Sequence, residues 1–250
     1  MNTKRLKNLS IKGLFLTCII FCGLAGCKKE LPQAGIGKPE QPKAKKGHRE
    51  LGLAFYDQGK NTEAIAEFKK AIADNTANVE VYSRLASAYY DEEMAADAIA
   101  TYKKVIEIEP SHVEARYDLG LVYIDEGLCD DGIAELKKVL EIDPKHEDAY
   151  YSLGEAYYEC NKKDDALTVW KTLLQDNPDD SILHYNIGII YKDKGQLKNA
   201  ISELQKAIAS DPDDEEAKTL LKELTIKEQG VKRTGNSKKI KKEAGKKSKK

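Results

Sequence analysis

Residues 113–146 read VEARYDLGLVYIDEGLCDDGIAELKKVLEIDPKH, and the pattern of this stretch recurs on both sides of it every 34 residues. Prolines mark the period, because Pro110, Pro144, Pro178 and Pro212 are each followed by two residues before the next unit begins. Five consecutive units result, and we number them repeats 1 to 5: 45–78, 79–112, 113–146, 147–180 and 181–214. Self-similarity at such a period predicts a stack of like structural repeats.

Within each repeat, the apolar residues fall on two helical faces. The seventh place is a large aliphatic residue and the eleventh an aromatic one: Leu51, Leu85, Leu119, Leu153 and Ile187, then Phe55, Tyr89, Tyr123, Tyr157 and Tyr191. The twentieth place is small and the twenty-fourth bulky: Ala64, Ala98, Gly132, Ala166 and Ala200, then Phe68, Tyr102, Leu136, Trp170 and Leu204. Places four, seven and eleven share one face and places twenty, twenty-four and twenty-seven another, so each repeat is predicted to be two amphipathic helices.

These places resemble those of the tetratricopeptide repeat family. The resemblance implies an all-α fold, a right-handed superhelical solenoid of five helix-turn-helix repeats over 45–214, followed by a capping helix at 215–229. The departures are local, such as Thr76 where proline is expected and Gly132 where alanine is expected. Glycine at that place is expected to weaken its helix by about 0.5–1 kcal/mol relative to alanine, so repeat 3 is expected to loosen first.

The resemblance also implies a concave groove lined by the first helix of each repeat, at places two, five, nine, twelve and thirteen. Places five and twelve carry tyrosines and place thirteen is always acidic: Tyr117, Tyr151, Tyr185, Tyr56, Tyr90 and Tyr158, with Asp57, Asp91, Asp125, Glu159 and Asp193. One hypothesis is a groove that binds a peptide segment of a partner protein, with the acids contacting Lys or Arg. The alternative is that the tyrosines pack between successive first helices and the acids form a solvated edge.

The N-terminus has the pattern of an export signal. Residues 1–26 place four basic residues before an apolar run at 13–24, which is shorter than the roughly 20 residues that span a bilayer. Leu24-Ala25-Gly26-Cys27 resembles the lipobox of bacterial lipoproteins, in which Cys27 would be acylated and become the mature N-terminus. The alternative is an ordinary secretory peptide with an accidental cysteine. Residues 27–44, rich in proline and lysine, are predicted to be a tether.

The charge of the chain is unevenly distributed. Residues 231–250 carry ten Lys or Arg and one acid, and residues 1–46 carry ten and two. Of the 41 basic and 42 acidic residues in the whole chain, 21 and 39 therefore remain in 47–230. An acidic body lies between two basic ends. The tail at 230–250 is predicted to be disordered, with attachment to an anionic lipid or envelope polymer as its candidate role; export argues against nucleic acid as a partner.

Catalytic and cofactor motifs are not evident. No nucleophile motif or glycine-rich phosphate loop stands out, and the four histidines follow the repeat grid rather than a metal-ligand spacing, so we expect neither an enzyme nor a metal or cofactor site. Cys129 and Cys160 fall near the turns between paired helices of repeats 3 and 4. An exported compartment permits a disulfide between them, but equivalent places of adjacent repeats lie too far apart, so two unpaired thiols are the expected state.

Together these features predict a non-enzymatic protein-interaction adaptor, lipid-anchored in the cell envelope. Similar lipoproteins assist the assembly of secretion or pilus secretins, of outer-membrane machinery or of peptidoglycan enzymes. Lys28 after the acylated cysteine resembles a signal for the outer membrane facing the periplasm; the outer face of the plasma membrane is the alternative. The second function class is a structural envelope protein, whose basic tail binds an anionic polymer while the repeats act as a spacer.

Overall fold

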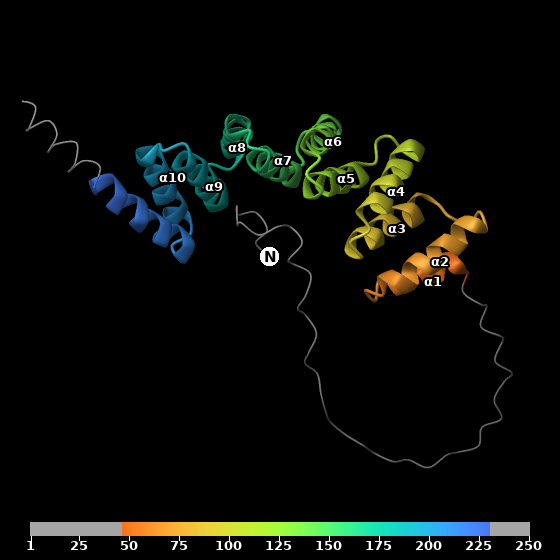
Figure 1. The fold of residues 1–250 in the computed structure, drawn as a ribbon. Helices are drawn as coiled ribbons and strands as arrows, with labels where there is room; N and C mark the ends of the chain where they lie inside the picture. Colours follow the sequence, from red (N-terminus) through yellow and green to blue (C-terminus); the bar gives the residue numbers. More distant parts are fainter. Residues whose placement is uncertain (1–46, 231–250) are drawn as a thin grey trace, which may run out of the picture. The chain divides into compact units, whose positions relative to one another are not determined.

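The computed structural model describes residues 47–230, and within this range it contains helices and connecting turns but no strand. Ten helices are labelled in Figure 1, two in each repeat. They are α1 (His48–Tyr56), α2 (Asn61–Ala73), α3 (Val79–Asp91), α4 (Ala95–Ile108), α5 (Val113–Asp125), α6 (Cys129–Ile142), α7 (Glu147–Glu159), α8 (Lys163–Asp176), α9 (Ser181–Asp193) and α10 (Leu197–Ser210). A final helix covers residues 215–230. The predicted all-α architecture of paired helices is confirmed.

The turn between the two helices of a repeat requires one residue in the left-handed region. Gly59, Gly127 and Gly195 supply it in repeats 1, 3 and 5, at φ values of 69°, 74° and 71°. Glu93 and Asn161 supply it in repeats 2 and 4, both at 58°. Glycine reaches this conformation without steric cost, which explains its recurrence just beyond the first helix of a repeat.

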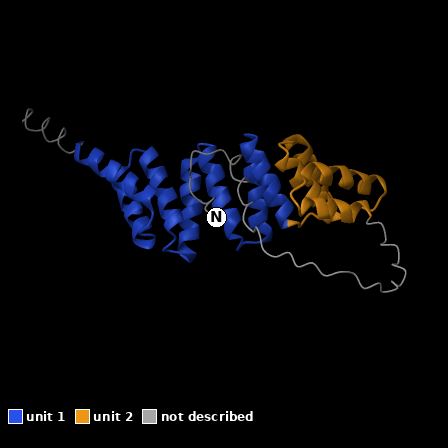
Figure 2. Ribbon diagram, turned by 90° about the horizontal axis from the view of Figure 1, so that it is seen from below, with its two compact units in different colours: residues 1–8, 113–250 blue, residues 9–112 orange. Residues whose placement is uncertain are grey.

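The described residues fall into two compact units, which we take in chain order: the first ends at residue 112 (orange in Figure 2) and the second begins at residue 113 (blue). In the described part of the first, helices α1 to α4 pack as two hairpins, and α2 also packs against α3. Its fully buried large side chains are Phe68, Tyr102, Val81 and Val105. Phe68, Tyr102 and Val105 lie at places twenty-four and twenty-seven of the predicted apolar face, whereas Val81 lies at place three, which the pattern did not single out.

The second compact unit holds α5 to α10 and the final helix. One core cluster surrounds the fully buried Trp170 and extends from Ile124 of α5 to Ile190 of α9. A second cluster joins Tyr185 and Leu204 to Ala217 and Leu224 of the final helix, both of which are fully buried. The final helix therefore covers apolar surface that repeat 5 would otherwise expose, as a terminal element of a repeat array must.

Gly132 has a packing role that its helix propensity does not reveal. A Cβ atom built at this position would lie 2.6 Å from Cδ1 of Ile124 and 2.8 Å from the backbone oxygen of Gly120. Helices α5 and α6 approach each other too closely for any side chain here. The expectation that Gly132 acts only as a weak point of its helix is therefore incomplete, because the close approach depends on glycine.

We therefore predict that Gly132→Ala destabilises the protein. Overpacking costs about 1–3 kcal/mol, and the gain in helix propensity returns only about 0.5–1 kcal/mol, so a net loss is expected in urea unfolding. Gly188→Ala is the matched control, because its Cβ would meet the flexible Leu204 side chain at 3.2 Å and the backbone oxygen of Ala200 only at 3.5 Å. Equal unfolding midpoints for the two variants would contradict this explanation.

Within each compact unit, adjacent repeats are joined along one edge, which we call the repeat seam. There, the start of a second helix (places 17 and 18) contacts the turn after the next repeat's first helix (places 13, 14 and 16). Asn61 donates to Asp91 at 3.2 Å between repeats 1 and 2, and Lys163 pairs with Asp193 at 3.4 Å between repeats 4 and 5. Thr62 with Glu92 and Lys194 with Asp164 make parallel contacts.

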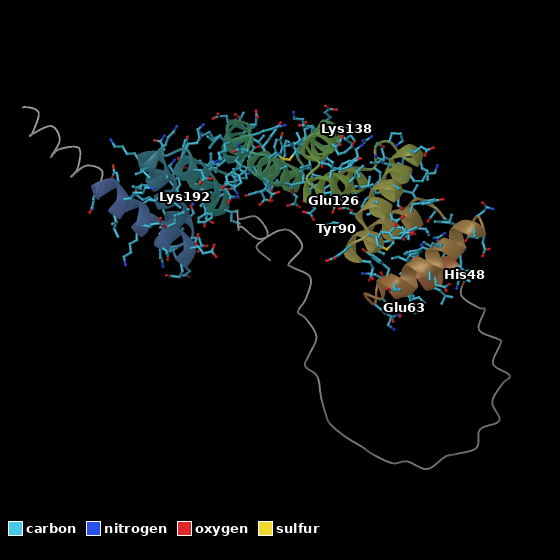
Figure 3. All side chains as sticks on the ribbon, viewed as in Figure 1. His48, Glu63, Tyr90, Glu126, Lys138 and Lys192 are labelled. Atoms are coloured by element: carbon cyan, nitrogen blue, oxygen red, sulfur yellow. A yellow bond between two sulfur atoms is a disulfide. The ribbon has the colours of Figure 1, made fainter. Side chains whose placement is uncertain are left out.

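Between repeats 3 and 4, the repeat seam holds a disulfide. Cys129 at place 17 and Cys160 at place 14 are bonded, with their Cα atoms 6.0 Å apart. The expectation of two unpaired thiols is therefore wrong. It rested on the distance between equivalent places of adjacent repeats, whereas these cysteines occupy different places that the stacking of repeats brings together. Figure 3 shows the bond in yellow.

Several sequence features lie outside the described residues. These are the leader at 1–26 with its lipobox and Cys27, the tether at 27–44, and most of the tail at 230–250. Within 47–230, no helix has both the length and the apolar character needed to cross a membrane.

Candidate protein-binding surface

The tyrosines at place five do not form the open row that the sequence suggested. Tyr151 and Tyr185 are only 4% and 8% exposed and belong to the core. The hydroxyl of Tyr151 donates to the carboxylate of Asp180, which caps α9 by accepting from the backbone nitrogen of Leu183 at 2.9 Å. For these two residues the packing alternative is correct, because each tyrosine is covered by its own neighbours.

Tyr117 is the place-five tyrosine that stays half-buried. Its ring stacks on that of His146 with 5.4 Å between centroids, and its hydroxyl lies 2.9 Å from Oγ of Ser152. Burial raises the pKa of Tyr117, and the charges of Asp148, Glu155 and Asp118 raise it further. The ring therefore lies at the edge of the core, within the field of several carboxylates.

The place-twelve tyrosines are all half-buried. In the first compact unit, the guanidinium of Arg84 lies 5.3 Å from the ring centroid of Tyr56, and Tyr90 lies at the end of α3 (Figure 3). In the second, Tyr158 donates to Asp193 at 2.7 Å, and Lys163 lies 5.9 Å from its ring centroid. Burial and the Asp193 carboxylate raise the pKa of Tyr158, so it remains a neutral donor at physiological pH. These rings keep part of their surface open to solvent.

The acids at place thirteen differ in their surroundings. Asp57 is exposed, Asp91 accepts from Asn61, and Asp193 accepts from Tyr158 and pairs with Lys163. Burial raises the pKa of Asp91, with the hydrogen bond from Asn61 acting against it. Asp91 and Asp193 therefore help to join adjacent repeats at the repeat seam.

Asp125 and Glu159 are the place-thirteen acids of repeats 3 and 4. Burial raises the pKa of Glu159, and the like charge of Asp125 in the preceding repeat raises it further. Adjacent carboxylates that repel each other are stabilised when a cation approaches both.

The carboxylates near Tyr117 were not among the residues singled out from the sequence. Asp148 lies at place two of α7, Glu155 at place nine of α7 and Asp118 at place six of α5. Asp148 and Glu155 do lie on the helix face assigned to the groove, but acids do not recur there in every repeat. We call Tyr117, Asp118, Asp148, Glu155 and Tyr158, with Asp125 and Glu159, the acidic surface of repeats 3 and 4.

The raised pKa of Glu159 gives a prediction for stability. A carboxyl group whose pKa is higher in the folded state favours folding most at pH values below its unfolded pKa, and that contribution is lost as the pH rises through the folded pKa. Glu159→Gln is therefore expected to be slightly more stable than the parent chain at pH 7, within about 0.5 kcal/mol, and indistinguishable from it near pH 4. Urea unfolding at both pH values measures this, and a variant less stable at pH 7 would contradict it.

The described residues show no clustering of metal ligands. In the range 47–230, no group of three or more His, Cys, Asp or Glu side chains is arranged to hold a metal ion. His48 and His184 instead contact Glu67 and Glu203 at 2.6 and 2.7 Å, and Arg116 contacts Glu135 at 2.7 Å in the same way. In repeats 1, 3 and 5, the residue at place four thus links the first helix of the repeat to its second helix.

Comparison with known proteins agrees with this architecture. The TPR repeat model matches residues 52–92, and two tetratricopeptide repeat models match residues 83–147 and residues 123–187 and 164–224. The comparison with curated proteins gives no significant match.

Solved structures share the fold. A crystal structure of MamA is 26% identical to this chain in sequence, with a TM-score of 0.60. The match covers 65% of this chain and 95% of the MamA chain. Another structure of MamA is 25% identical at a TM-score of 0.61, covering 66% and 90%. The crystal structure of YrrB, described as a TPR protein with an unusual peptide-binding site, is 20% identical at a TM-score of 0.61, covering 70% and 90%. Arrays of such repeats are scaffolds that bind other proteins on extended surfaces, and this chain belongs to the tetratricopeptide repeat family.

Proposed function

We propose that this protein is a non-catalytic adaptor, anchored by lipid in a bacterial cell envelope, which holds a basic segment of a partner protein. The acidic surface of repeats 3 and 4 is the proposed binding site. By holding one component, the adaptor would assist assembly of an envelope complex such as a secretion or pilus secretin, outer-membrane machinery or peptidoglycan machinery.

The observation that carries the binding proposal is the gathering of carboxylates around Tyr117. Asp118, Asp148 and Glu155 come from two successive repeats, and the charge of each raises the pKa of the Tyr117 hydroxyl. A half-buried aromatic ring supplies apolar contact area with little entropy to lose. Surrounding carboxylates select lysine or arginine side chains and speed association with a basic partner.

Two features support the envelope location. Leu24-Ala25-Gly26-Cys27 follows a basic and then apolar leader, and acylation with more than one chain would give a stable anchor. The second supporting feature is the disulfide between Cys129 and Cys160, because disulfides persist in exported compartments and are rare in the cytosol. Lys28 favours the outer membrane of a two-membrane cell as the destination.

The test is binding of a defined probe to the full chain. A fluorescent peptide of alternating lysine and leucine is titrated against the parent chain and against Asp148→Asn/Glu155→Gln. The double variant is expected to bind the peptide about tenfold more weakly than the parent chain, a difference of ~1.4 kcal/mol. This difference should shrink as salt screens the charges. Substituting Tyr117, Tyr151 and Tyr185 together is a poorer test, because two of them are core residues.

The control variant is Glu141→Gln/Asp176→Asn. It removes the same charge from exposed positions at the ends of α6 and α8, outside the acidic surface. Net charge alone would weaken binding equally in both variants, whereas a site weakens it only in the first. Equal affinities for the two variants would disprove the site.

A further inference from the structure

The disulfide occupies a position that other repeats fill with weaker contacts. Along the repeat seam, repeats 1 and 2 are joined by hydrogen bonds, and repeats 4 and 5 by ion pairs. Between repeats 3 and 4, the bond from Cys129 to Cys160 is accompanied by an ion pair of Lys162 with Asp130 at 2.7 Å. Asp130 is 92% exposed, and ion pairs of such exposure contribute little to stability.

Helix α6 needs a firm attachment at its first turn. It begins at Cys129 with no side-chain cap from Leu128, and Gly132 in this turn is a poor helix former. Asp130 and Asp131 in the same turn favour the helix dipole but are exposed. Further along α6, Ile133, Leu136 and Val139 are buried and fix the rest of the helix without the disulfide.

We propose that this protein is a client of thiol–disulfide exchange in the exported compartment, and that the bond so formed fixes the first turn of α6 against the turn after α7. The proposal rests on the export part of the proposed function. It goes further in naming the reaction that the chain must undergo and the segment that the reaction orders.

The exchange needs a disulfide-bearing oxidant, either a protein or a small molecule. One cysteine thiolate attacks the oxidant's disulfide, forming a mixed disulfide and expelling one oxidant thiolate. The second cysteine thiolate then attacks the sulfur of the first cysteine, forming the Cys129–Cys160 bond and releasing the other oxidant thiolate. The two protein thiols lose two electrons and two protons, and the oxidant takes them up to become a dithiol or two thiols.

The sequence leaves one intramolecular pairing in the mature chain. Of the five cysteines, Cys18 and Cys22 lie in the predicted leader, and Cys27 would carry the lipid on its sulfur. Cys129 and Cys160 are then the two remaining thiols, separated by 31 residues and brought together by the stacking of repeats 3 and 4. Exchange therefore cannot produce a wrong pairing within one mature chain.

Thiol trapping of the full chain in cells tests the exchange. Cells are quenched with acid, fractionated, and labelled with a maleimide polymer that shifts the band on a gel. In the membrane fraction we expect no label before reduction and one label on each of Cys129 and Cys160 after it. A chain lacking residues 1–27, whose cysteines are Cys129 and Cys160, should stay in the cytoplasm with both thiols labelled directly. Membrane-bound chain labelled before reduction, or leaderless chain that is fully oxidised, would overturn the proposal.

Failure of export is distinguishable from failure of the bond. If the full chain is found in the cytoplasm with free thiols, the proposed location is wrong. The purified, reduced chain lacking residues 1–27, whose cysteines are Cys129 and Cys160, is then treated with oxidised glutathione. An intramolecular bond should close, and amide exchange in residues 130–133 should slow about tenfold, while exchange in α2 (Asn61–Ala73) of repeat 1 stays unchanged. A mixed disulfide that never closes, or identical exchange before and after oxidation, would refute the proposed role of the bond.

Discussion

Trp170→Ala is expected to cost about 3–5 kcal/mol of unfolding free energy, the range for truncating a buried aromatic residue. Trp170 is fully buried at the centre of the cluster that joins repeats 3, 4 and 5, and its Nε1 donates to the backbone oxygen of Tyr151 at 3.3 Å. Its ring lies against Gly154, where a Cβ atom would come within 2.0 Å of Nε1. Truncation would leave a cavity that these close-packed helices cannot fill.

The measurement is urea unfolding followed by far-ultraviolet circular dichroism, because Trp170 is the chain's one tryptophan and its loss removes the fluorescence signal. Thr172→Ala is the control, since Thr172 is exposed on the same helix and its hydroxyl bonds only to the backbone oxygen of Thr168. The control should change stability by less than about 0.5 kcal/mol. A Trp170 variant as stable as the control would show that this core is not the one described.

Removing the disulfide is the second large effect. Cys129→Ala/Cys160→Ala is expected to lose about 2–4 kcal/mol, because the bond restricts a loop of 31 residues in the unfolded chain. In a repeat array each repeat contacts mainly its neighbours, so the loss should centre on repeats 3 and 4.

Reduction of the parent chain provides the matching experiment. A reductant should lower the unfolding midpoint of the parent chain to that of the double variant, and should leave the double variant unchanged. Parent and variant with equal midpoints under oxidising conditions would show that the bond contributes no stability.

The paired helices were predictable from the sequence because their cause is local. The large residues at places seven, eleven and twenty-four act within one repeat or on its neighbour. So do the proline that follows the second helix in repeats 2 to 5 and the glycine of the turn in repeats 1, 3 and 5. Phe68, Trp170 and Leu204 are buried where the period places them. The final helix followed from Ala217 and Leu224, which are spaced to cover a terminal repeat.

The binding surface was predictable only in part, because it depends on how repeats stack. Tyr151 looked exposed on a single helix, yet the Asp180 cap of the following helix covers its hydroxyl. The Cys129–Cys160 bond depends on the offset between places seventeen and fourteen, which no single repeat reveals. Asp148 and Glu155 belong to the next repeat, and their charges raise the pKa of Tyr117. This effect becomes visible only when the repeats are stacked.

The most direct test of the adaptor account is site-specific crosslinking in living cells. A photoreactive amino acid replaces Glu155 on the acidic surface or, as a control, the exposed Glu141 near the end of α6. A discrete crosslinked protein is expected at position 155, with lysine or arginine in the crosslinked segment identified by mass spectrometry, and none at position 141. The same adducts at both positions, or none at position 155, would contradict it.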